Sequence, residues 1–392
     1  LLVNNLCGSP FGAGWSLDGV QRLYVQRDGA VVLTEGDGSI KRFDLGTVGT
    51  GTFAESGRFG VGSFPRDVKT ADFNQDGILD LVSADHDSDQ LSLLLGTGGG
   101  SFSAASTFAV GDGPWDMAVA DYNRDGLADL AVTNELSDDI SIYLGNGFGG
   151  FRPERRIVVG DRPLMIDSGD MDGDGNPDLV LANGVGGARG VSVLLGDGRG
   201  EFNAGGFTAA AAQDVQIGDM DGDRRLDVIA SLWPRNTVSL LLGDGQGGLG
   251  DPVDTEAGNQ VTNGADLADV DLDGDLDLLV PNFGSADVSV LLNDGSGNFD
   301  APLRFATGPN ARRVITGDFD VDGFLDMAVP NQGGRSVSVL LGDGTGSFAT
   351  AVNYTVGTTP RSIVAADFDG DGLLDLAVGN SGDRNIMVLL GV

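Results

Sequence analysis

The sequence is nearly free of the two side chains that most often carry transition-metal and nucleophilic chemistry. It contains one cysteine, Cys7, and one histidine, His86, in 392 residues. A single cysteine excludes a disulfide within the chain and a cysteine-based zinc site, and it leaves open a disulfide between chains or a free thiol. His86 stands in an Asp-rich turn beside Asp85 and Asp87. That setting favours a solvated loop residue over a general base.

Positive charge and long apolar runs are also scarce. Lys and Arg number 23 against 58 Asp and Glu, which gives a formal net charge of −35. This balance argues against a nucleic-acid partner, because affinity for phosphate backbones depends on Lys and Arg. No apolar run reaches the ~18 residues of a membrane-spanning helix, so we expect no membrane insertion. A chain that begins at Leu1 without an apolar leader is expected after signal-peptide cleavage or as a segment of a longer product.

What the sequence does contain is one acidic motif repeated seven times. The nine-residue motifs lie at intervals of 49 or 50 residues and begin at Asp72, Asp121, Asp170, Asp219, Asp269, Asp318 and Asp367. Each repeat also holds short apolar runs between Gly, Asp and Asn turns, which predicts four β-strands per repeat. No segment shows a sustained helical period. We therefore predict an all-β fold, a seven-bladed β-propeller with four-stranded blades.

The two ends of the repeat region predict how the ring closes. The seventh repeat stops at Val392 after its third strand. Its missing fourth strand is found near the start, where residues 51–65 match the pattern of residues 100–114. An N-terminal strand that completes the last blade would remove the open sheet edges. We therefore predict that residues 51–392 form the propeller domain.

Residues 1–50 lie outside the repeat. Three apolar runs, at 20–26, 30–34 and 39–43, are separated by Asp-Gly pairs that suit tight hairpin turns. The pattern predicts a β-hairpin extension ahead of the propeller.

Each acidic motif places oxygen-bearing side chains at alternate positions. Asp stands at the first, fifth and ninth positions and Asp or Asn at the third, while the variable seventh residue is expected to contribute its backbone carbonyl. Alternating hard oxygen ligands suit Ca²⁺, which takes six to eight of them. The predicted ligands are Asp72, Asn74, Asp76, Ile78, Asp80; Asp121, Asn123, Asp125, Leu127, Asp129; Asp170, Asp172, Asp174, Asn176, Asp178; Asp219, Asp221, Asp223, Arg225, Asp227; Asp269, Asp271, Asp273, Asp275, Asp277; Asp318, Asp320, Asp322, Phe324, Asp326; and Asp367, Asp369, Asp371, Leu373, Asp375.

The alternative interpretation is that these Asp-Gly segments are ordinary turns that end strands. Three or four carboxylates around one point repel each other unless a cation is present, and a solvated turn would avoid that repulsion. The repetition therefore favours up to seven Ca²⁺ ions, one per blade. In the fourth motif Arg224 replaces the usual glycine and Arg225 follows it. We expect that loop to hold its ion more weakly.

The motif D-x-[DN]-x-D-G-x-x-D, once per repeat with a Leu-Gly-Asp-Gly turn and a Phe, resembles the FG-GAP/VCBS repeat family, whose best-known members are the heads of integrin α subunits. The resemblance covers residues 51–392. It implies a seven-bladed propeller with Ca²⁺ between the first and second strands of a blade, at the rim of one face. Integrin-type heads usually carry the ion in only some blades, whereas all seven motifs here have the ligand pattern.

The same observations bear on function. The sequence has no nucleophile elbow, Walker loop or Cys/His arrangement, and calcium accounts for its carboxylate pairs, so we expect no enzymatic activity. Calcium sites of this kind suit the millimolar calcium outside cells. We predict a secreted or cell-surface protein that acts in adhesion, or a structural protein that self-assembles into homo-oligomers or filaments through residues 1–50 and shared Ca²⁺.

The alternative is a lectin-like module that binds a glycan or an extracellular protein on the face opposite the calcium loops. Turns expected on that face carry Trp233 and begin with Asn134, Asn183, Asn282, Asn331 and Asn380. Trp233 could stack on a sugar ring. The simpler interpretation is that the Asn residues suit turn conformations and that Trp233 caps its blade.

Overall fold

The computed structural model describes residues 49–184, 190–208, 212–232, 236–258 and 264–392, together with the backbone of three strands nearer the N-terminus. The chain divides into two compact units, Leu1–Val48 and Gly49–Val392. In the first unit β1 (Val20–Val25), β2 (Val31–Glu35) and β3 (Ile40–Phe43) form an antiparallel sheet in that order. Cys7 lies outside the described residues.

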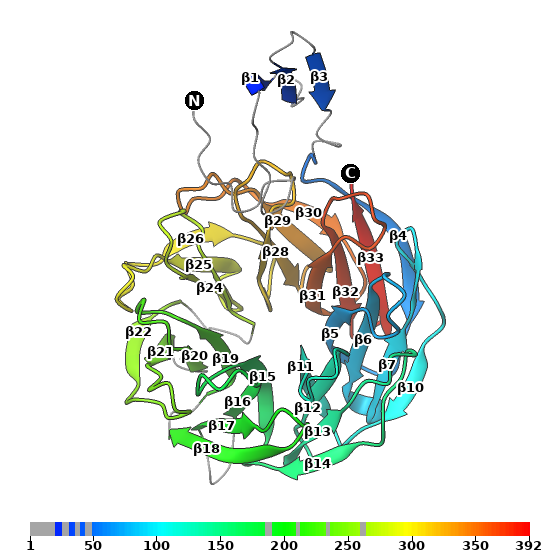
Figure 1. Cartoon of the computed structure of the whole chain (residues 1–392), viewed down its shortest axis with the longest axis vertical. Helices are drawn as coiled ribbons and strands as arrows, with labels where there is room; N and C mark the ends of the chain where they lie inside the picture. The colour runs from blue at the N-terminus through cyan, green and yellow to red at the C-terminus, as the bar shows by residue number, and fades with distance from the viewer. Residues whose placement is uncertain are drawn as a thin grey trace. The chain divides into compact units, whose positions relative to one another are not determined.

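The second unit is a ring of seven four-stranded antiparallel sheets (Figure 1). Blade 1 contains β5 (Pro65–Ala71), β6 (Asp80–Asp85), β7 (Gln90–Leu94) and β10 (Ser106–Ala109). Blade 2 contains β11 (Pro114–Ala120), β12 (Asp129–Asn134), β13 (Asp139–Tyr143) and β14 (Arg155–Val158). Blade 3 contains β15 (Pro163–Gly169), β16 (Asp178–Asn183), β17 (Gly190–Gly196) and β18 (Phe202–Thr208). Blade 4 contains β19 (Asp214–Gly218), β20 (Asp227–Leu232), β21 (Thr237–Leu241) and β22 (Val253–Glu256).

The remaining blades follow the same plan. Blade 5 contains β23 (Asp266–Ala268), β24 (Asp277–Asn282), β25 (Asp287–Leu291) and β26 (Leu303–Ala306). Blade 6 contains β27 (Ile315–Gly317), β28 (Asp326–Asn331), β29 (Ser336–Leu340) and β30 (Val352–Thr355). Blade 7 contains β31 (Pro360–Ala366), β32 (Asp375–Asn380), β33 (Asn385–Gly391) and β4 (Phe53–Gly60). Blade 1 adds a two-stranded sheet, β8 (Gly96–Gly98) with β9 (Ser101–Phe102), and a 3₁₀ turn, η1 (His86–Ser88).

The pairing of β4 with β33 closes the ring as predicted. In the antiparallel register Phe59 lies opposite Ile386 and Phe53 lies opposite Gly391. The Phe53 ring also packs edge-on against Phe319 and Tyr354 of blade 6, with ring centroids 5.7 and 5.4 Å apart. The N-terminal strand is therefore fixed by ladder hydrogen bonds and by the burial of Phe53 against blade 6. The predicted fold, an all-β propeller of seven four-stranded blades, is confirmed.

The hydrophobic core lies between adjacent blades. The second strand of most blades is buried along its whole length, as in β12, while outer strands such as β14 are largely exposed. Phe73 of blade 1, for example, packs in one cluster with Met117 and Val132 of blade 2. The second residue of each acidic motif is buried in such a cluster, as the sequence predicted: Phe73, Tyr122, Met171, Met220, Val270, Phe319 and Phe368.

A second set of contacts joins neighbouring blades beside the central channel. Asp side chains on the first strands accept hydrogen bonds from backbone N–H groups of the next blade. Asp116 Oδ2 lies 3.0 Å from the nitrogen of Ile166, and Asp214 Oδ2 lies 2.7 Å from that of Gly264. Equivalent bonds join Asp67 to Met117, Asp167 to Ile217 and Asp266 to Thr316. Three of these carboxylates, Asp67, Asp116 and Asp214, are buried, and together the five link five successive blade junctions.

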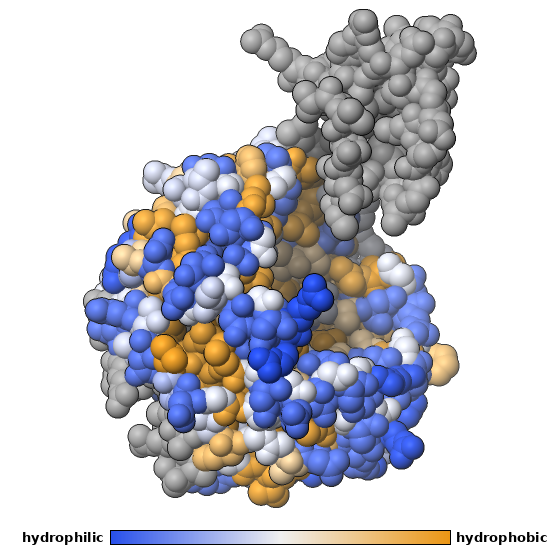
Figure 2. Space-filling view, turned by 60° about the vertical axis from the view of Figure 1, so that its left-hand side comes forward, coloured by the Kyte–Doolittle hydropathy of each residue, from blue (hydrophilic) through white to orange (hydrophobic). Residues whose placement is uncertain are grey.

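Figure 2 shows one side of the propeller, where apolar residues lie among hydrophilic ones. Among the described residues, no helix has the length and apolar character needed to cross a bilayer.

Candidate metal centres

The seven acidic motifs form the loops between the first and second strands of the blades, such as the loop from Ala71 to Asp80 that joins β5 to β6. All blades run in the same direction around the ring (Figure 1), so the seven loops lie at the same end of the channel. This is the location that the family resemblance implied.

Each loop winds around its first carboxylate. In the first loop Asp72 Oδ2 accepts a hydrogen bond from the nitrogen of Gly77 at 2.8 Å, and Asp76 Oδ1 accepts one from the nitrogen of Ile78, also at 2.8 Å. The same two bonds recur in all seven loops. They turn the carboxylates of the first and fifth residues toward the inside of the loop.

The ninth residue has a different role from the others. Asp80 is fully buried, and its two oxygens accept hydrogen bonds from the nitrogens of Phe73, at 2.9 Å, and Gly96, at 2.7 Å. The equivalent Asp of every other blade makes the same pair of bonds: Asp129, Asp178, Asp227, Asp277, Asp326 and Asp375. This residue therefore fastens the start of the loop to the end of the third strand.

Burial of this carboxylate has an electrostatic consequence. Desolvation raises the pKa of Asp80 to about 6, and the charges of Asp76 and Asp72 add to the shift, although the two backbone N–H bonds oppose it. The same causes raise the pKa of Asp326 to about 6. Each loop thus concentrates negative charge that its own backbone donors compensate only in part.

In five blades the carboxylates converge closely enough to share one cation. Three carboxylates in each loop offer oxygens that lie within 4.8 Å of one another. In three of the blades, 3, 4 and 6, the set comprises the first, third and ninth residues: Asp170, Asp172 and Asp178; Asp219, Asp221 and Asp227; Asp318, Asp320 and Asp326. In blades 5 and 7 it comprises the first, third and fifth: Asp269, Asp271 and Asp273; Asp367, Asp369 and Asp371.

Unsatisfied oxygens within these loops fit a bound cation. Oδ1 of the first residue is buried and has no hydrogen-bond partner in three loops, at Asp170, Asp219 and Asp269. A buried carboxylate oxygen without a donor costs free energy, which a coordinated cation would offset. Because the donors are all hard oxygens, Ca²⁺ or Mg²⁺ fits better than a soft transition metal. The residues present therefore fit the predicted ion.

The loops of blades 1 and 2 differ in their third residue. Asn74 and Asn123 replace the third Asp, and their Oδ1 atoms accept hydrogen bonds from the nitrogens of Asp76 and Asp125, both at 2.9 Å. These loops offer one carboxylate fewer than the others. In blade 2, Arg152 also pairs with Asp125 at 2.8 Å. Calcium binding by these two loops stays a prediction.

The fourth loop contains an internal cation. The Arg225 side chain forms an ion pair with Asp223, and Arg225 Nε lies 2.6 Å from Oδ2 of that residue. Arg224 adopts a positive φ of 69° at the position where the other loops have glycine. Positive φ is unfavourable for a residue with a side chain. Both features agree with the expectation that this loop holds its ion less tightly, which itself stays a prediction.

The residues at the seventh position show no shared side-chain role. Ile78, Leu127, Asp275, Phe324 and Leu373 have little chemistry in common, and all seven place their backbone nitrogen on the fifth carboxylate. Asn176 and Arg225 additionally bond the fifth carboxylate through their side chains. Use of the backbone carbonyl at this position stays a prediction.

The Asn residues of the opposite face do not have the role expected of ligand-binding residues. Each of the five is the last residue of a second strand, where the turn to the third strand begins, and each is buried with a side chain that bonds the third strand. Asn331 Nδ2, for example, lies 2.8 Å from Ser338 Oγ. In the turn that follows Asn331, the residue with a positive φ is Arg335, not the asparagine. These Asn side chains link the second strand to the third and, because they are buried, are not available to a ligand. Trp233 lies outside the described residues.

His86 is not a solvated loop residue. Its side chain is only 15% exposed, and Nε2 lies 3.1 Å from Glu135 Oε2 in blade 2. The imidazole packs edge-on against Trp115 and Phe64, with ring centroids 5.9 and 6.1 Å apart. The local sequence is polar, but residues of a neighbouring repeat bury the ring.

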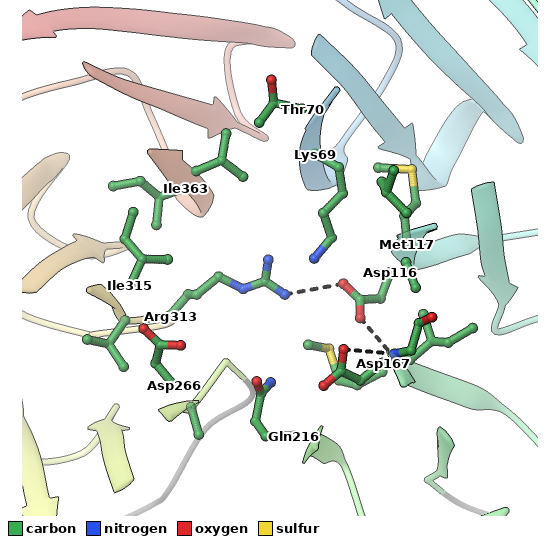
Figure 3. Close-up of a pocket in the computed structure, with 18 of the residues that line it drawn as sticks. Lys69, Thr70, Asp116, Met117, Asp167, Gln216, Asp266, Arg313, Ile315 and Ile363 are labelled. Carbon is green, nitrogen blue, oxygen red and sulfur yellow. Dashed lines mark hydrogen bonds and ion pairs between the residues drawn. The ribbon is translucent and has the colours of Figure 1, made fainter. Parts of the chain in front are cut away.

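Sequence reasoning missed the charged interior of the channel. A cavity of about 500 Å³ is lined by the charged residues Lys69, Asp116, Asp167, Asp266 and Arg313 and by apolar residues such as Ile315 and Ile363 (Figure 3). These charged residues stand three or five positions before the first Asp of a loop. Charged residues at these two repeat positions could have indicated the channel interior, but the residue type at each position changes from blade to blade.

Comparison with known proteins agrees with this description. A family model described as FG-GAP-like repeat matches residues 72–132, 121–181, 170–230, 219–280 and 322–378. No curated protein matches the sequence.

Similar solved structures show the fold. A lectin from Agrocybe aegerita, which recognises non-reducing terminal N-acetylglucosamine, is 18% identical with a TM-score of 0.53, over 83% of this chain and 87% of the lectin. BBS1N, solved in complex with ARL6DN, is 13% identical with a TM-score of 0.62, over 87% and 97% of the two chains. The WD40 propeller domain of Doa1 is 11% identical with a TM-score of 0.58, over 86% and 97%. At these identities the likeness concerns the fold alone.

Proposed function

Because this chain belongs to the FG-GAP-like repeat family, we propose that it is an extracellular, non-enzymatic adhesion module whose propeller is stabilised by one Ca²⁺ ion per blade. The observation that carries the proposal is the sevenfold loop, in which backbone N–H groups hold carboxylates in a converging arrangement. Such loops suit an environment with millimolar free calcium, which favours a location outside the cell.

The residues of each loop would bind the ion in different ways. The carboxylates at the first, third and fifth positions would supply most of its oxygen ligands, and the backbone carbonyl of the seventh would add another. The ninth carboxylate would face the ion while its two hydrogen bonds anchor the loop to the blade. When bound, Ca²⁺ neutralises charge that otherwise repels within the loop, and its preference for the folded loop stabilises the propeller.

Adhesion is the role that this arrangement serves best. A rigid ring presents the turns of its blades on one face, and loops held by a stable scaffold are the usual carriers of binding residues. The carboxylates of the acidic loops are accounted for by the ion, which leaves them no catalytic task. Assembly into homo-oligomers or filaments through residues 1–48 is a separate proposal, motivated by the sheet β1-β2-β3 ahead of the ring.

Thermal unfolding in calcium and in excess chelator tests the proposal. We expect a melting temperature at least about 10 °C higher in 1 mM Ca²⁺ than in chelator, since several bound ions each contribute to the folded state. Equal melting temperatures would contradict it. Sedimentation velocity of the full chain and of a variant lacking residues 1–48, both in calcium, tests the assembly proposal. Identical monomers in both samples would exclude assembly through that segment.

A further inference from the structure

A cluster of arginines lies at the end of the channel opposite the acidic loops. The residue six positions before the first loop Asp is Arg312 in blade 6, Arg361 in blade 7 and Arg66 in blade 1, and the same position in blade 2 is Trp115. The four side chains line a cavity of about 40 Å³ together with Asp116, Met165 and Arg313. Three consecutive blades therefore contribute one arginine each to the same channel mouth.

Aromatic rings hold these guanidinium groups in place. Arg66 Cζ lies 3.4 Å from the ring centroid of Trp115 and 5.1 Å from that of Phe64, and Arg361 Cζ lies 4.8 Å from Phe64. Arg312 Cζ similarly lies 4.7 Å from Phe283. Cation–π contacts of this kind orient a guanidinium group without neutralising its charge. Among the described residues, Nε of Arg66 and Nε of Arg361 are buried and have no hydrogen-bond partner.

Among the described residues Arg66 and Arg361 form no ion pair, whereas Arg312 donates a hydrogen bond from Nε to Oε1 of Gln332 at 2.6 Å. Burial, followed by the charges of Arg361 and Arg312, lowers the pKa of Arg66 to about 9, and burial with the charge of Arg361 lowers the pKa of Arg312 to about 10. Asp87, an exposed residue, opposes the shift at Arg66. The chain as a whole bears a net charge of −35. Gathering three arginines at one mouth is costly unless an anion binds there.

We propose that Arg66, Arg312 and Arg361 form a binding site for a single carboxylate on an otherwise neutral ligand, namely an acidic sugar residue. A guanidinium fork matches the planar geometry of a carboxylate. The cavity of about 40 Å³ has room for little more than such a group. The strongly acidic chain repels a dianion or polyanion more than a monoanion, which disfavours phosphate, sulfated chains and highly acidic peptides.

The surroundings of the site suit a sugar ring. Trp115, Phe64 and His86 form a continuous aromatic border, with ring centroids about 6 Å apart. Contacts within the protein hold this border in place: His86 Nδ1 pairs with Asp87, His86 Nε2 pairs with Glu135, and Glu135 also pairs with Arg162. Apolar ring faces with a few polar groups are typical of small-ligand sites. The inference deepens the proposed adhesive function by naming a ligand class, and it rests on that function for its biological meaning.

Isothermal titration calorimetry of the full chain in 1 mM Ca²⁺ tests the site. D-glucuronate is expected to bind with a stoichiometry of one, acetate to compete with it, and D-glucose to show no binding. The Arg66→Gln and Arg361→Gln substitutions are each expected to weaken glucuronate binding at least tenfold. Arg304→Gln is the matched control, because Arg304 is exposed on the outer strand β26, and it should leave binding unchanged.

A conservative variant separates binding from folding. Arg361→Lys keeps the charge but removes the planar fork, so glucuronate affinity should fall at least fivefold while the melting temperature stays within about 2 °C of the wild type. If wild-type protein binds neither glucuronate nor acetate, or if R66Q, R361Q and R361K all bind like the wild type, the proposal is wrong. Tighter binding of inorganic phosphate than of acetate would overturn the carboxylate assignment. Tighter binding of a neutral peptide with one Glu than of glucuronate would overturn the sugar assignment.

The calcium proposal and the sugar proposal can fail separately. The arginine cluster contains none of the predicted calcium ligands, so glucuronate binding with no calcium effect on melting would contradict only the calcium proposal. Calcium-dependent melting without glucuronate binding would contradict only the site proposed here.

Discussion

Arg313 of blade 6 reaches across the central channel to Asp67 of blade 1, where its Nη1 lies 2.6 Å from Oδ1 of the carboxylate. Its Nη2 lies 3.2 Å from Asp116 of blade 2 (Figure 3). Burial acts to raise the pKa of Asp67, but the charges of Lys69 and Arg313 outweigh it and leave that pKa lowered. One side chain thus compensates carboxylates that belong to two other blades. The ring is held together through its centre as well as through its blade interfaces.

Replacing Arg313 by Met should destabilise the propeller severely. The substitution leaves Asp67 and Asp116 buried without their cation, and loss of one partner of a buried ion pair typically costs about 3–5 kcal/mol. Urea unfolding at saturating calcium measures the change. The triple variant R313M/D67N/D116N should recover part of the loss, since it also removes the uncompensated charges. A loss below about 1 kcal/mol in R313M would contradict this account of the channel.

Asp214 predicts a specific pH dependence. Burial raises the pKa of Asp214 to about 6 in the folded state. The folded protein therefore holds a proton on Asp214 at a pH where the unfolded chain has lost it. The contribution of Asp214 to stability falls as the pH rises from about 4 to 6, and it reaches a penalty of about 3 kcal/mol above that range.

The Asp214→Asn substitution should remove that penalty. Compared with wild type in urea unfolding at saturating calcium, the variant should gain about 2–3 kcal/mol in relative stability between pH 4 and pH 8. Titration of the calcium ligands affects both proteins equally, so it does not contribute to the difference in their unfolding free energies. A difference between the two proteins that does not change with pH would show that folding does not raise the pKa of Asp214.

Replacing Arg224 by Gly should stabilise the fourth loop. Arg224 has a φ of 69°, a conformation that glycine adopts without steric cost. We expect a gain of about 0.5–1 kcal/mol in chelator, and a larger gain in calcium because the sixth residue would then match that of the other six loops and a positive charge beside the ion would be removed. Arg199→Gly, an exposed change in a neighbouring turn, controls for the loss of positive charge. Destabilisation by R224G in chelator would contradict the argument from backbone conformation.

Two carboxylates of the seventh loop should behave differently when substituted. Asp375 is fully buried and accepts hydrogen bonds from the nitrogens of Phe368 and Gly391, at 2.7 and 2.8 Å. Asp375→Ala leaves two buried N–H groups without acceptors and should cost about 2–5 kcal/mol, even in chelator. Asp371 is exposed. Asp371→Asn should not lower stability in chelator, because it removes one of the repelling charges, while it should reduce the stabilisation by calcium. Equal effects of the two variants in chelator would contradict this division of roles.

The sequence predicted those features that repeat identically. Seven motifs at regular intervals predicted seven blades, and the match of residues 51–65 to residues 100–114 predicted the pairing of β4 with β33. The apolar second residue of each motif, such as Phe73, was correctly predicted to be buried. Periodicity is informative here because every blade buries the same repeat positions against its neighbour and uses similar residue types there.

Features that depend on one blade meeting another could not be predicted in this way. Asp67 and Arg313 are 246 residues apart and occupy the same position of their repeats, where two other blades have Asp116 and Asp214. The burial of His86 likewise depends on Trp115 and Glu135 in the next repeat. The anchoring role of the ninth Asp was missed because its second partner, such as Gly96 for Asp80, lies 16 residues further along the chain. Local patterns do not encode these distant contacts.

A direct count of bound calcium tests the central claim most directly. Protein stripped with chelator and equilibrated by dialysis against 1 mM Ca²⁺ can be analysed for metal by mass spectrometry and compared with the protein concentration. The account predicts six to seven Ca²⁺ ions per chain, with the D371N variant lower by one. A stoichiometry near zero in wild-type protein, with the fold intact by circular dichroism, would contradict the claim that the seven acidic loops are calcium sites.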